Sequence, residues 1–293
     1  KKKKKKKFNS IDIMNKQLIS KPVVENIYEN IKNKIKNNNK LIKLSIIIVG
    51  NRQDSLTYVN IKKKKCSELG ISCEIYNYNE NVSEKDIIDK INEFNEDISV
   101  NGIMVQLPLP KYLNQLNILS KISIDKDVDG LHPQNLGLIM MNKEPIYYPC
   151  TPLGCIKLLE YYDIDLEKQN IVFVGSGMVN LPLSVMLLNK KVGSISLCNE
   201  NTGNIKDKTI LADILIVACG QPKMIKKDWI KENVIIIDIG INRDLNNKLC
   251  GDVDYEDVID KVKYITPVPG GVGPMTVCML INNLIKNKIF VNI

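Results

Sequence analysis

The segment TYVNIKKKKCSELG, residues 57–70, combines a phenol with four consecutive lysines. Tyr58 and Lys62 are four positions apart, so a helix would place both side chains on one face. A lysine that is partly removed from water beside another cation loses basicity and can transfer protons near neutral pH. Helical periodicity alone favours a plainer interpretation, in which all four lysines are solvated.

A second group of residues has the types and spacing of a nucleotide site. The segment GSGMVNLP, residues 175–182, follows the apolar run IVFVG and precedes a helical pattern. Backbone N–H groups at such a strand-to-helix turn favour a pyrophosphate. Glu200 ends the next apolar run, where a carboxylate can accept hydrogen bonds from ribose hydroxyls. The third glycine of a GxGxxG pattern is absent, because Asn180 stands there, so a simple tight turn remains an alternative.

Histidine, metal and disulfide chemistry have little support in the composition. The only histidine is His132, and the eight cysteines occur singly, with no CxxC pair. We therefore expect no metal site and no Ser-His or Cys-His mechanism. Reduced thiols are typical of an intracellular protein, cytoplasmic or mitochondrial. The sequence begins with lysine, so we expect that an upstream segment is missing from it.

The net charge of +8 comes almost entirely from the unbroken run Lys1–Lys7. Without it, 34 basic residues (41 − 7) oppose 33 acidic ones, a net charge of +1. We therefore expect a disordered basic tail over residues 1–10 and a nearly neutral folded body. A nucleic-acid or anionic-surface binder using its lysine runs is an alternative from another class, although few aromatic residues are available for stacking. No apolar run approaches the roughly 20 residues of a membrane span.

The elements that must position these residues alternate between β-rich runs and helical patterns. In the first half the sequence predicts strands over 43–50 and 71–78, a strand within 101–110 that ends in a proline-rich loop, and helices over 14–38, 54–70 and 83–96. In the second half it predicts strands over 171–175, 194–199, 213–220, 234–240 and 264–271 and a last helix over 275–290. The second set is rich in Val and Ile, as in parallel strands buried on both faces. The predicted fold class is α/β, with two α/β domains, the second a Rossmann-like dinucleotide-binding domain.

Several proline and glycine loops follow one another in an order that resembles a known enzyme family over nearly the whole chain. They are VQLPLP (105–110), DVDGLHPQNLG (127–137), PCTPLG (149–154), IDIGIN (237–242), GDVD (251–254) and TPVPGGVGPMT (266–276). With the YxxxK helix, they are similar to the bifunctional methylenetetrahydrofolate dehydrogenase/methenyltetrahydrofolate cyclohydrolase family. The resemblance implies oxidation of methylenetetrahydrofolate with a nicotinamide cofactor, then hydrolysis to 10-formyltetrahydrofolate, in one-carbon metabolism and purine biosynthesis.

The resemblance also implies roles for individual residues. Lys62 would be the central catalytic lysine and Gln106 would tune it. Tyr58 would stack on the aminobenzoate of the folate, and Asp129 would hold the pterin ring. The remaining substrate contacts would be Leu107, Pro108, Gly271 and Pro274, and the cofactor contacts would be Gly175, Ser176, Gly177, Glu200, Thr151, Ile241 and Gly220. The four catalytic residues are intact, which argues against a scaffold that keeps the fold without turnover.

The same resemblance implies a domain organisation. A folate-binding catalytic domain would cover residues 11–150 and a nucleotide-binding domain residues 151–274, with the catalytic cleft between them. The final helix, within residues 275–293, would pack back on the catalytic domain. The family forms homodimers through the nucleotide domain. The expected partners are therefore tetrahydrofolate derivatives and a second copy of the chain, with no nucleic acid and no membrane.

Two segments depart from the family pattern and leave the cofactor open. The family usually has GRSxxVGxP at the nucleotide loop and His-Ser-Arg/Lys-Thr after the second strand, where this chain has GSGMVNLP and NENT, residues 199–202. Both basic groups that could pair with a 2′-phosphate are missing, and Glu200 would repel one. Family membership implies NADP, whereas the charges favour NAD or a mainly cyclohydrolase activity. Alternatively, Lys190, Lys191 or Lys206 supplies the cation.

Overall fold

The structure is a computed structural model that describes residues 14–37 and 41–289, with side chains described as far as Lys286. The predicted basic tail over residues 1–10, and residues 290–293 of the predicted C-terminal segment, lie outside this range. The chain divides into two compact units. Among the described residues, the five-strand unit comprises residues 14–23 and 154–275, and the three-strand unit comprises residues 24–37, 41–153 and 276–289. Within the described ranges, no helix has the length and apolar character needed to cross a bilayer.

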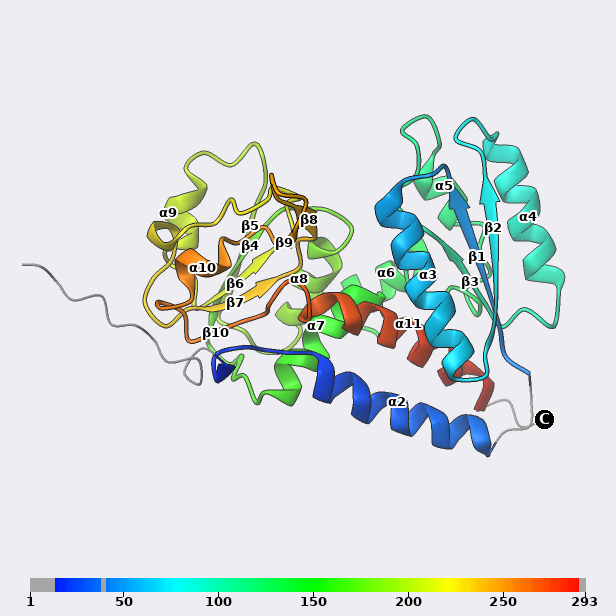
Figure 1. The fold of residues 1–293 in the computed structure, drawn as a ribbon, viewed down its shortest axis with the longest axis horizontal. Helices are drawn as coiled ribbons and strands as arrows, with labels where there is room; N and C mark the ends of the chain where they lie inside the picture. Colours follow the sequence, from blue (N-terminus) through cyan, green and yellow to red (C-terminus); the bar gives the residue numbers. More distant parts are fainter. Residues whose placement is uncertain (1–13, 38–40, 290–293) are drawn as a thin grey trace, which may run out of the picture. The chain divides into compact units, whose positions relative to one another are not determined.

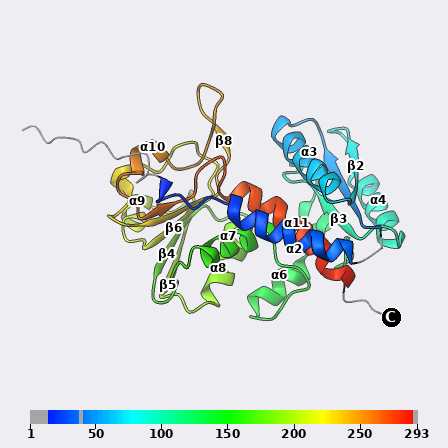
Figure 2. The same ribbon diagram turned by 60° about the horizontal axis from the view of Figure 1, so that its bottom comes forward.

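The three-strand unit is built on a parallel sheet with the strand order β2-β1-β3 (Figure 1). Its strands are β1 (Lys43–Val49), β2 (Ser72–Tyr78) and β3 (Gly102–Val105). Its helices include α3 (Gln53–Glu68), α4 (Glu84–Glu96), α5 (Gln115–Leu119) and α6 (Pro133–Met140). Helices α3 and α4 lie on opposite faces of the sheet (Figures 1 and 2).

The apolar pattern of α4 explains how one face of this sheet is covered. Ile87, Ile91 and Phe94 recur with helical spacing and pack in one buried cluster with Ile47 and Val49 of β1. Alternate residues of a strand point to opposite faces, so Leu44, Ile46 and Ile48 point to the face on which α3 lies. The sheet therefore fixes which side of α3 is buried.

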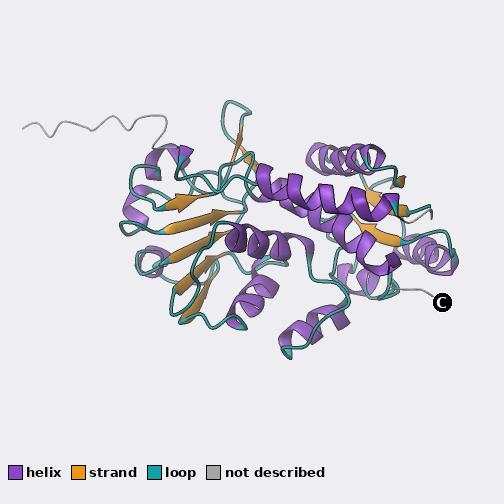
Figure 3. Cartoon of the chain, turned by 90° about the horizontal axis from the view of Figure 1, so that it is seen from below, coloured by secondary structure: helices purple, strands orange, loops and turns teal. Residues whose placement is uncertain are grey.

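The five-strand unit is built on a second parallel sheet, whose strands lie side by side in Figure 3. The strand order is β10-β7-β6-β4-β5 (Figure 1). Its strands are β4 (Asn170–Val174), β5 (Ser194–Cys198), β6 (Ile214–Val217), β7 (Ile235–Asp238) and β10 (Tyr264–Ile265). It also contains an antiparallel hairpin of β8 (Asn242–Arg243) and β9 (Leu249–Cys250). Its helices include α8 (Asn180–Leu188), α9 (Ile205–Thr209), α10 (Tyr255–Val258) and the 3₁₀ helix η1 (Lys227–Trp229).

Strands β4 and β6 mark the point where the strand order of this sheet reverses. After β5 the chain passes over β4 to form β6 on its other side. Open parallel sheets bind ligands beyond the carboxyl ends of the strands at such a reversal. Three further helices cross the boundary between the units along the sequence: α2 (Lys21–Lys36), α7 (Cys150–Tyr161) and α11 (Val272–Ile289).

Two of the predicted strands differ in the structure. The segment 264–271 forms only the short β10, because the prolines and glycines that follow cannot extend a ladder. Burial on both faces is confirmed for β4, β6 and β7 but is wrong for β5. β5 is the outer strand of the sheet, and its residues before Cys198 are exposed or half-buried.

The segment before α2 groups with the five-strand unit, although residues 11–150 were expected to form one domain. Its backbone pairs with β10: the Leu18 N–H donates to Ile265 O, and the Ile265 N–H donates to Lys16 O, each at 2.9 Å. The Ser20 N–H donates to Gly270 O at 2.9 Å. The edge strand β10 and the loop after it thus form backbone hydrogen bonds with residues 16–20, which lie near the other end of the sequence. No local sequence pattern predicts this pairing.

Candidate active site

The four lysines of α3 have different environments. Val59, Lys62 and Cys66 share the buried face of the helix, and Lys62 is only 4% exposed. Lys63 and Lys64 are exposed, as expected for a solvated helix face. The plainer interpretation is therefore correct for Lys63 and Lys64 but wrong for Lys62, because the spacing of Val59, Lys62 and Cys66 turns that one ammonium inward.

The Lys62 ammonium has a defined partner. Its Nζ donates to Gln106 Oε1 at 2.8 Å. Gln106 directly follows β3, where its N–H donates to Ile47 O at 2.8 Å. The Gln106 Nε2 donates to Leu107 O at 2.7 Å, which leaves Oε1 turned toward the lysine. The sheet and the loop after β3 fix Gln106, and helix α3 fixes Lys62, so that the amide oxygen lies within hydrogen-bond distance of the amine.

Charge and burial act in opposite directions on Lys62 and Asp129. Burial lowers the pKa of Lys62, and the negative charge of Asp129 partly offsets that fall. Burial likewise raises the pKa of Asp129, and the charge of Lys62 opposes the rise. A buried amine with a lowered pKa can lose and regain a proton near neutral pH. The pair is thus suited to general acid–base chemistry.

The turn that carries Asp129 is held by buried polar contacts. Asp127 accepts hydrogen bonds from the His132 N–H at 2.8 Å and from Asn135 Nδ2 at 2.9 Å. Burial raises the pKa of Asp127 to about 7. His132 caps α6, where its Nδ1 accepts from the Gln134 N–H at 3.1 Å. Asp127 and His132 therefore build the turn.

Gly130 and Asn283 complete this turn. Gly130 has a φ of +73°, and a Cβ there would lie 2.5 Å from Tyr148 O, so only glycine fits. The buried Asn283 of α11 donates from Nδ2 to Val128 O and to Tyr148 O, each at 3.0 Å. Sequence reasoning missed Asn283, and its only local signal is an asparagine pair, residues 282–283, inside the apolar stretch 277–285.

The remaining sequence-predicted folate contacts are distributed over both units. Tyr58 is half-buried one turn before Lys62, which leaves ring surface for stacking, and burial raises its pKa. Leu107 is half-buried and Pro108 exposed in the loop after Gln106. Gly271, which is buried, and Pro274, which is exposed, belong to the five-strand unit.

The glycine turn after β4 has the geometry of a phosphate cradle. Gly175 has a φ of +102°, and a Cβ there would lie 2.1 Å from Ala218 O. A Cβ on Gly177 would meet open space, so a ligand can approach its backbone. Asn180 replaces the missing glycine and donates to Val174 O at 3.1 Å and Gly175 O at 2.9 Å. The hydrogen bonds of the Asn180 side chain thus stabilise a turn whose shape fits a dinucleotide pyrophosphate.

Most of the other predicted cofactor residues gather at the same edge of the five-strand sheet. Ser176, Glu200, Gly220 and Ile241 lie in loops at the carboxyl ends of parallel strands, together with Gly175 and Gly177. Thr151 belongs to the three-strand unit, where its hydroxyl lies 2.9 Å from that of Thr276.

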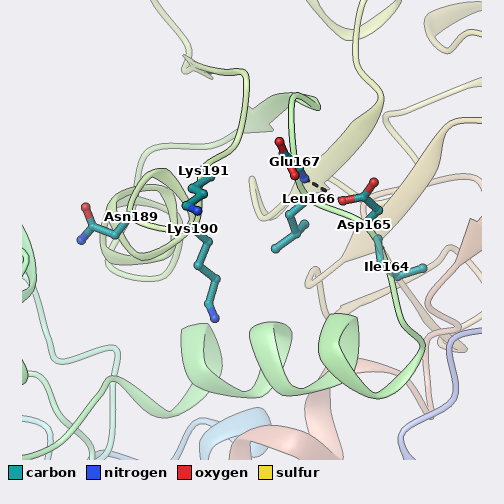
Figure 4. A pocket seen from close by; sticks show the side chains of 7 residues that line it. All are labelled: Ile164, Asp165, Leu166, Glu167, Asn189, Lys190 and Lys191. Atoms are coloured by element: carbon teal, nitrogen blue, oxygen red, sulfur yellow. Dashed lines mark hydrogen bonds between the residues drawn. The ribbon is translucent and has the colours of Figure 1, made fainter.

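A shallow pocket at the opposite end of the sheet corrects one expectation. It is lined by Ile164, Asp165, Leu166, Glu167, Asn189, Lys190 and Lys191 (Figure 4). These residues precede β4 and β5, so Lys190 and Lys191 lie at the amino ends of the strands and cannot reach a 2′-phosphate at the carboxyl ends. Lys206 follows β5 but forms an ion pair with Asp228.

One α/β unit with a dinucleotide cradle and another with a buried lysine, an amide and a carboxylate define a nicotinamide-dependent enzyme with acid–base chemistry. Residues 149–290 match the family described as tetrahydrofolate dehydrogenase/cyclohydrolase, NAD(P)-binding domain, and residues 17–129 match the catalytic domain of the same family. The chain belongs to this tetrahydrofolate dehydrogenase/cyclohydrolase family, which confirms the resemblance inferred from its sequence.

Individual relatives agree. The Bifunctional protein FolD of Campylobacter jejuni is 44% identical over 265 residues, which cover 88% of this chain and 94% of the relative. The crystal structure of the bifunctional FolD enzyme from Campylobacter jejuni has a TM-score of 0.88 at 43% identity, covering 92% of this chain and 97% of that one. The Trypanosoma brucei dehydrogenase-cyclohydrolase, complexed with NADP and an inhibitor, has a TM-score of 0.87 at 30% identity, covering 94% and 98%.

Proposed function

We propose that Lys62, Gln106, Tyr58 and Asp129 carry the chemistry of this bifunctional enzyme. The chain is a methylenetetrahydrofolate dehydrogenase and a methenyltetrahydrofolate cyclohydrolase. The first reaction oxidises the methylene bridge of the folate to a methenyl cation, and the second hydrolyses that cation to 10-formyltetrahydrofolate. The observation that supports the assignment best is the buried Lys62 ammonium, 2.8 Å from Gln106 Oε1 and within the field of Asp129.

Lys62 is the proton-transfer group in the hydrolysis. Water bonds to the methenyl carbon, and the bond from that carbon to one folate nitrogen breaks. Of the two protons of the water, one ends on that nitrogen and the other is released. An amine whose pKa is lowered by burial can take the first proton and return it to the nitrogen.

The other three residues bind and orient. Gln106 accepts from the ammonium and so sets both the position and the basicity of Lys62. Asp129 can accept from adjacent N–H donors of a pterin ring. Tyr58 offers a ring face, one helical turn from the amine, to the aminobenzoate. In the dehydrogenase reaction the bound nicotinamide supplies the hydride acceptor, and these residues hold the folate in position.

Replacing Lys62 by methionine tests this assignment. The Lys62→Met variant keeps the length of the buried side chain but has no exchangeable proton. We expect methenyltetrahydrofolate hydrolysis to slow by about 10²-fold or more, as followed by the decay of methenyl absorbance. The exposed neighbour Lys63 gives the matched control, since Lys63→Met should keep the parent rate. Hydrolysis by Lys62→Met at the parent rate would remove Lys62 from the mechanism.

For the cofactor we propose NADP, with Lys208 supplying the cation that the sequence otherwise lacks. Lys208 lies on α9, after β5. Burial raises the pKa of Cys198, the last residue of β5, and the positive charge of Lys208 opposes the rise. The Trypanosoma brucei relative is a complex with NADP. The second candidate is NAD, because the exposed Glu200 lies in the turn after the same strand and would repel a 2′-phosphate.

Kinetics with both cofactors distinguish these candidates. An NADP preference in kcat/KM of about ten-fold, or 1.4 kcal/mol, supports the first. We then expect Lys208→Gln to lower kcat/KM for NADP by about five-fold and Glu200→Gln to raise it, with little change for NAD. A preference for NAD that Lys208→Gln leaves unchanged would reject NADP.

We also infer a homodimer formed through the five-strand unit. β5 has a free outer edge, and such edges are protected or paired in stable proteins. Leu197 of β5 and Leu181 and Leu188 of α8, which contacts β5, are exposed apolar residues. A second copy of the chain would cover this surface. Sedimentation equilibrium should show a dimer that Leu197→Asp dissociates and Leu245→Asp, on the exposed hairpin, leaves intact.

A further inference from the structure

Two buried aspartates lie beneath the carboxyl edge of the five-strand sheet. Asp238 is the last residue of β7 and Asp252 follows β9. Their exposed fractions are 3% and 0%. Neither lies near the lysine of the folate chemistry in the sequence, and unpaired buried carboxylates are costly. Their hydrogen bonds show what they hold.

The Asp252 carboxylate accepts hydrogen bonds from the backbone of the loop after β6. Its Oδ2 accepts from the N–H groups of Cys219 at 2.7 Å and Gly220 at 3.1 Å. Its Oδ1 accepts from the Gln221 N–H at 2.8 Å and from Asn242 Nδ2 at 2.8 Å. With two bonds on each oxygen, the accepting capacity of the carboxylate is filled. Asp252 is therefore a positioning group rather than a base or a direct ligand.

Asp238 holds Asp252 in turn. Its Oδ1 accepts from the N–H groups of Gly240 at 3.0 Å and Asp252 at 3.1 Å, and its Oδ2 accepts from the Val253 N–H at 3.0 Å. The neighbouring glycines leave no room for a side chain. A Cβ on Gly240 would lie 2.3 Å from Asp252 Cγ, and one on Gly251 would lie 1.8 Å from Asp238 Oδ2. We call Asp238 and Asp252 the aspartate latch.

The loop held by the latch lies where a nucleotide would bind. Residues 219–221 follow β6 at the reversal point of the strand order, next to the glycine turn after β4. The two loops touch, because Ala218 O occupies the space that a Cβ on Gly175 would need. Gly220 and Gln221 are exposed, so a ligand can reach them. The latch thus sets the shape of one wall of the nucleotide site from its buried side.

We propose that Asp252 is a positioning residue for the nicotinamide cofactor: its carboxylate holds residues 219–221 in the shape that binds the cofactor and takes no part in the folate chemistry. This inference rests on the proposed function, in that it requires the cofactor to bind at the carboxyl edge of the five-strand sheet. Lys62, Gln106 and Asp129 all belong to the three-strand unit. The two activities of the enzyme should therefore respond differently when the latch is broken.

The Asp252→Asn variant tests the proposal. Its amide keeps the shape of the carboxylate, but an NH₂ group faces backbone N–H donors and the charge is lost. Losing charge-assisted hydrogen bonds should raise the cofactor KM of the dehydrogenase by at least about ten-fold. Cofactor-free hydrolysis of methenyltetrahydrofolate should stay within about two-fold of the parent, because Lys62, Gln106 and Asp129 lie outside the loop that Asp252 holds.

Two further variants make the test independent of folding. Asp254→Asn lies two residues along the same segment and removes a carboxylate that is paired with Lys226 at 2.6 Å, so it should change neither activity. Asn242→Ala removes one donor and keeps Asp252. It should raise the cofactor KM by about three-fold, and it decides the question if Asp252→Asn does not fold.

The outcomes separate the latch from the proposed function. A selective rise in cofactor KM supports the latch. Equal losses of both activities, or no change in cofactor KM, would overturn it. If the parent protein itself did not oxidise methylenetetrahydrofolate with NADP or NAD, the proposed function would fail before the latch is tested.

Discussion

Replacing Gln106 by glutamate places a carboxylate where an amide oxygen now accepts from Lys62 at 2.8 Å. Two unit charges about 4 Å apart interact by about 4 kcal/mol at an effective dielectric constant of about 20. Because Gln106 is half-buried, solvent screening reduces this to about 2–3 kcal/mol. The carboxylate stabilises the ammonium and so raises the pKa of Lys62. At about 1.4 kcal/mol per ten-fold, the neutral amine becomes on the order of 10² times rarer at a given pH.

The assay is the pH profile of methenyltetrahydrofolate hydrolysis. If the neutral amine takes the proton from water, the rising limb of the Gln106→Glu profile moves to higher pH by about 1.5–2 units. Gln106→Leu removes an acceptor from the ammonium, so its rising limb should move to lower pH. Opposite shifts cannot come from a general loss of packing. Profiles that coincide with the parent, or shift in the same direction, would refute the role of Gln106 in setting the basicity of Lys62.

Three further substitutions in the three-strand unit have calculable effects. Burial raises the pKa of Asp127 from 3.8 to about 7, so its contribution to stability is present below about pH 4 and is lost as the pH rises through 7. Between pH 5 and pH 8 the parent should therefore lose about 2–3 kcal/mol more unfolding free energy than Asp127→Asn in chemical denaturation, and equal losses would contradict this. Gly130→Ala forces a Cβ within 2.5 Å of Tyr148 O and should lower the unfolding free energy by about 2 kcal/mol or more and raise the folate KM, whereas parent-like denaturation would contradict it. Asn283→Leu removes the amide donor to Val128 O and Tyr148 O and should raise the folate KM with the cofactor KM unchanged, so a rise in both would indicate a general effect.

The sequence by itself determined the features that depend on short windows. Apolar β-rich runs that alternate along the chain with helical patterns predicted two α/β domains. They could do so because the periodicities of strands and helices are local properties of the sequence. The four-residue spacing of Tyr58 and Lys62 placed them one turn apart on α3 for the same reason. The glycine turn at Gly175 followed from its position between a strand and a helix. The order of proline and glycine loops was enough to identify the family.

Tertiary structure decided which of these residues are placed for chemistry. Lys62 differs from Lys63 and Lys64 only because that face of α3 meets the sheet and Gln106, 44 positions away in the sequence. Asn283 reaches Val128 across 155 positions. The same limit explains why β5 was expected to be buried and why the aspartate latch went unnoticed. Burial and hydrogen-bond partners are set by contacts between distant segments, and no local window of sequence contains both partners.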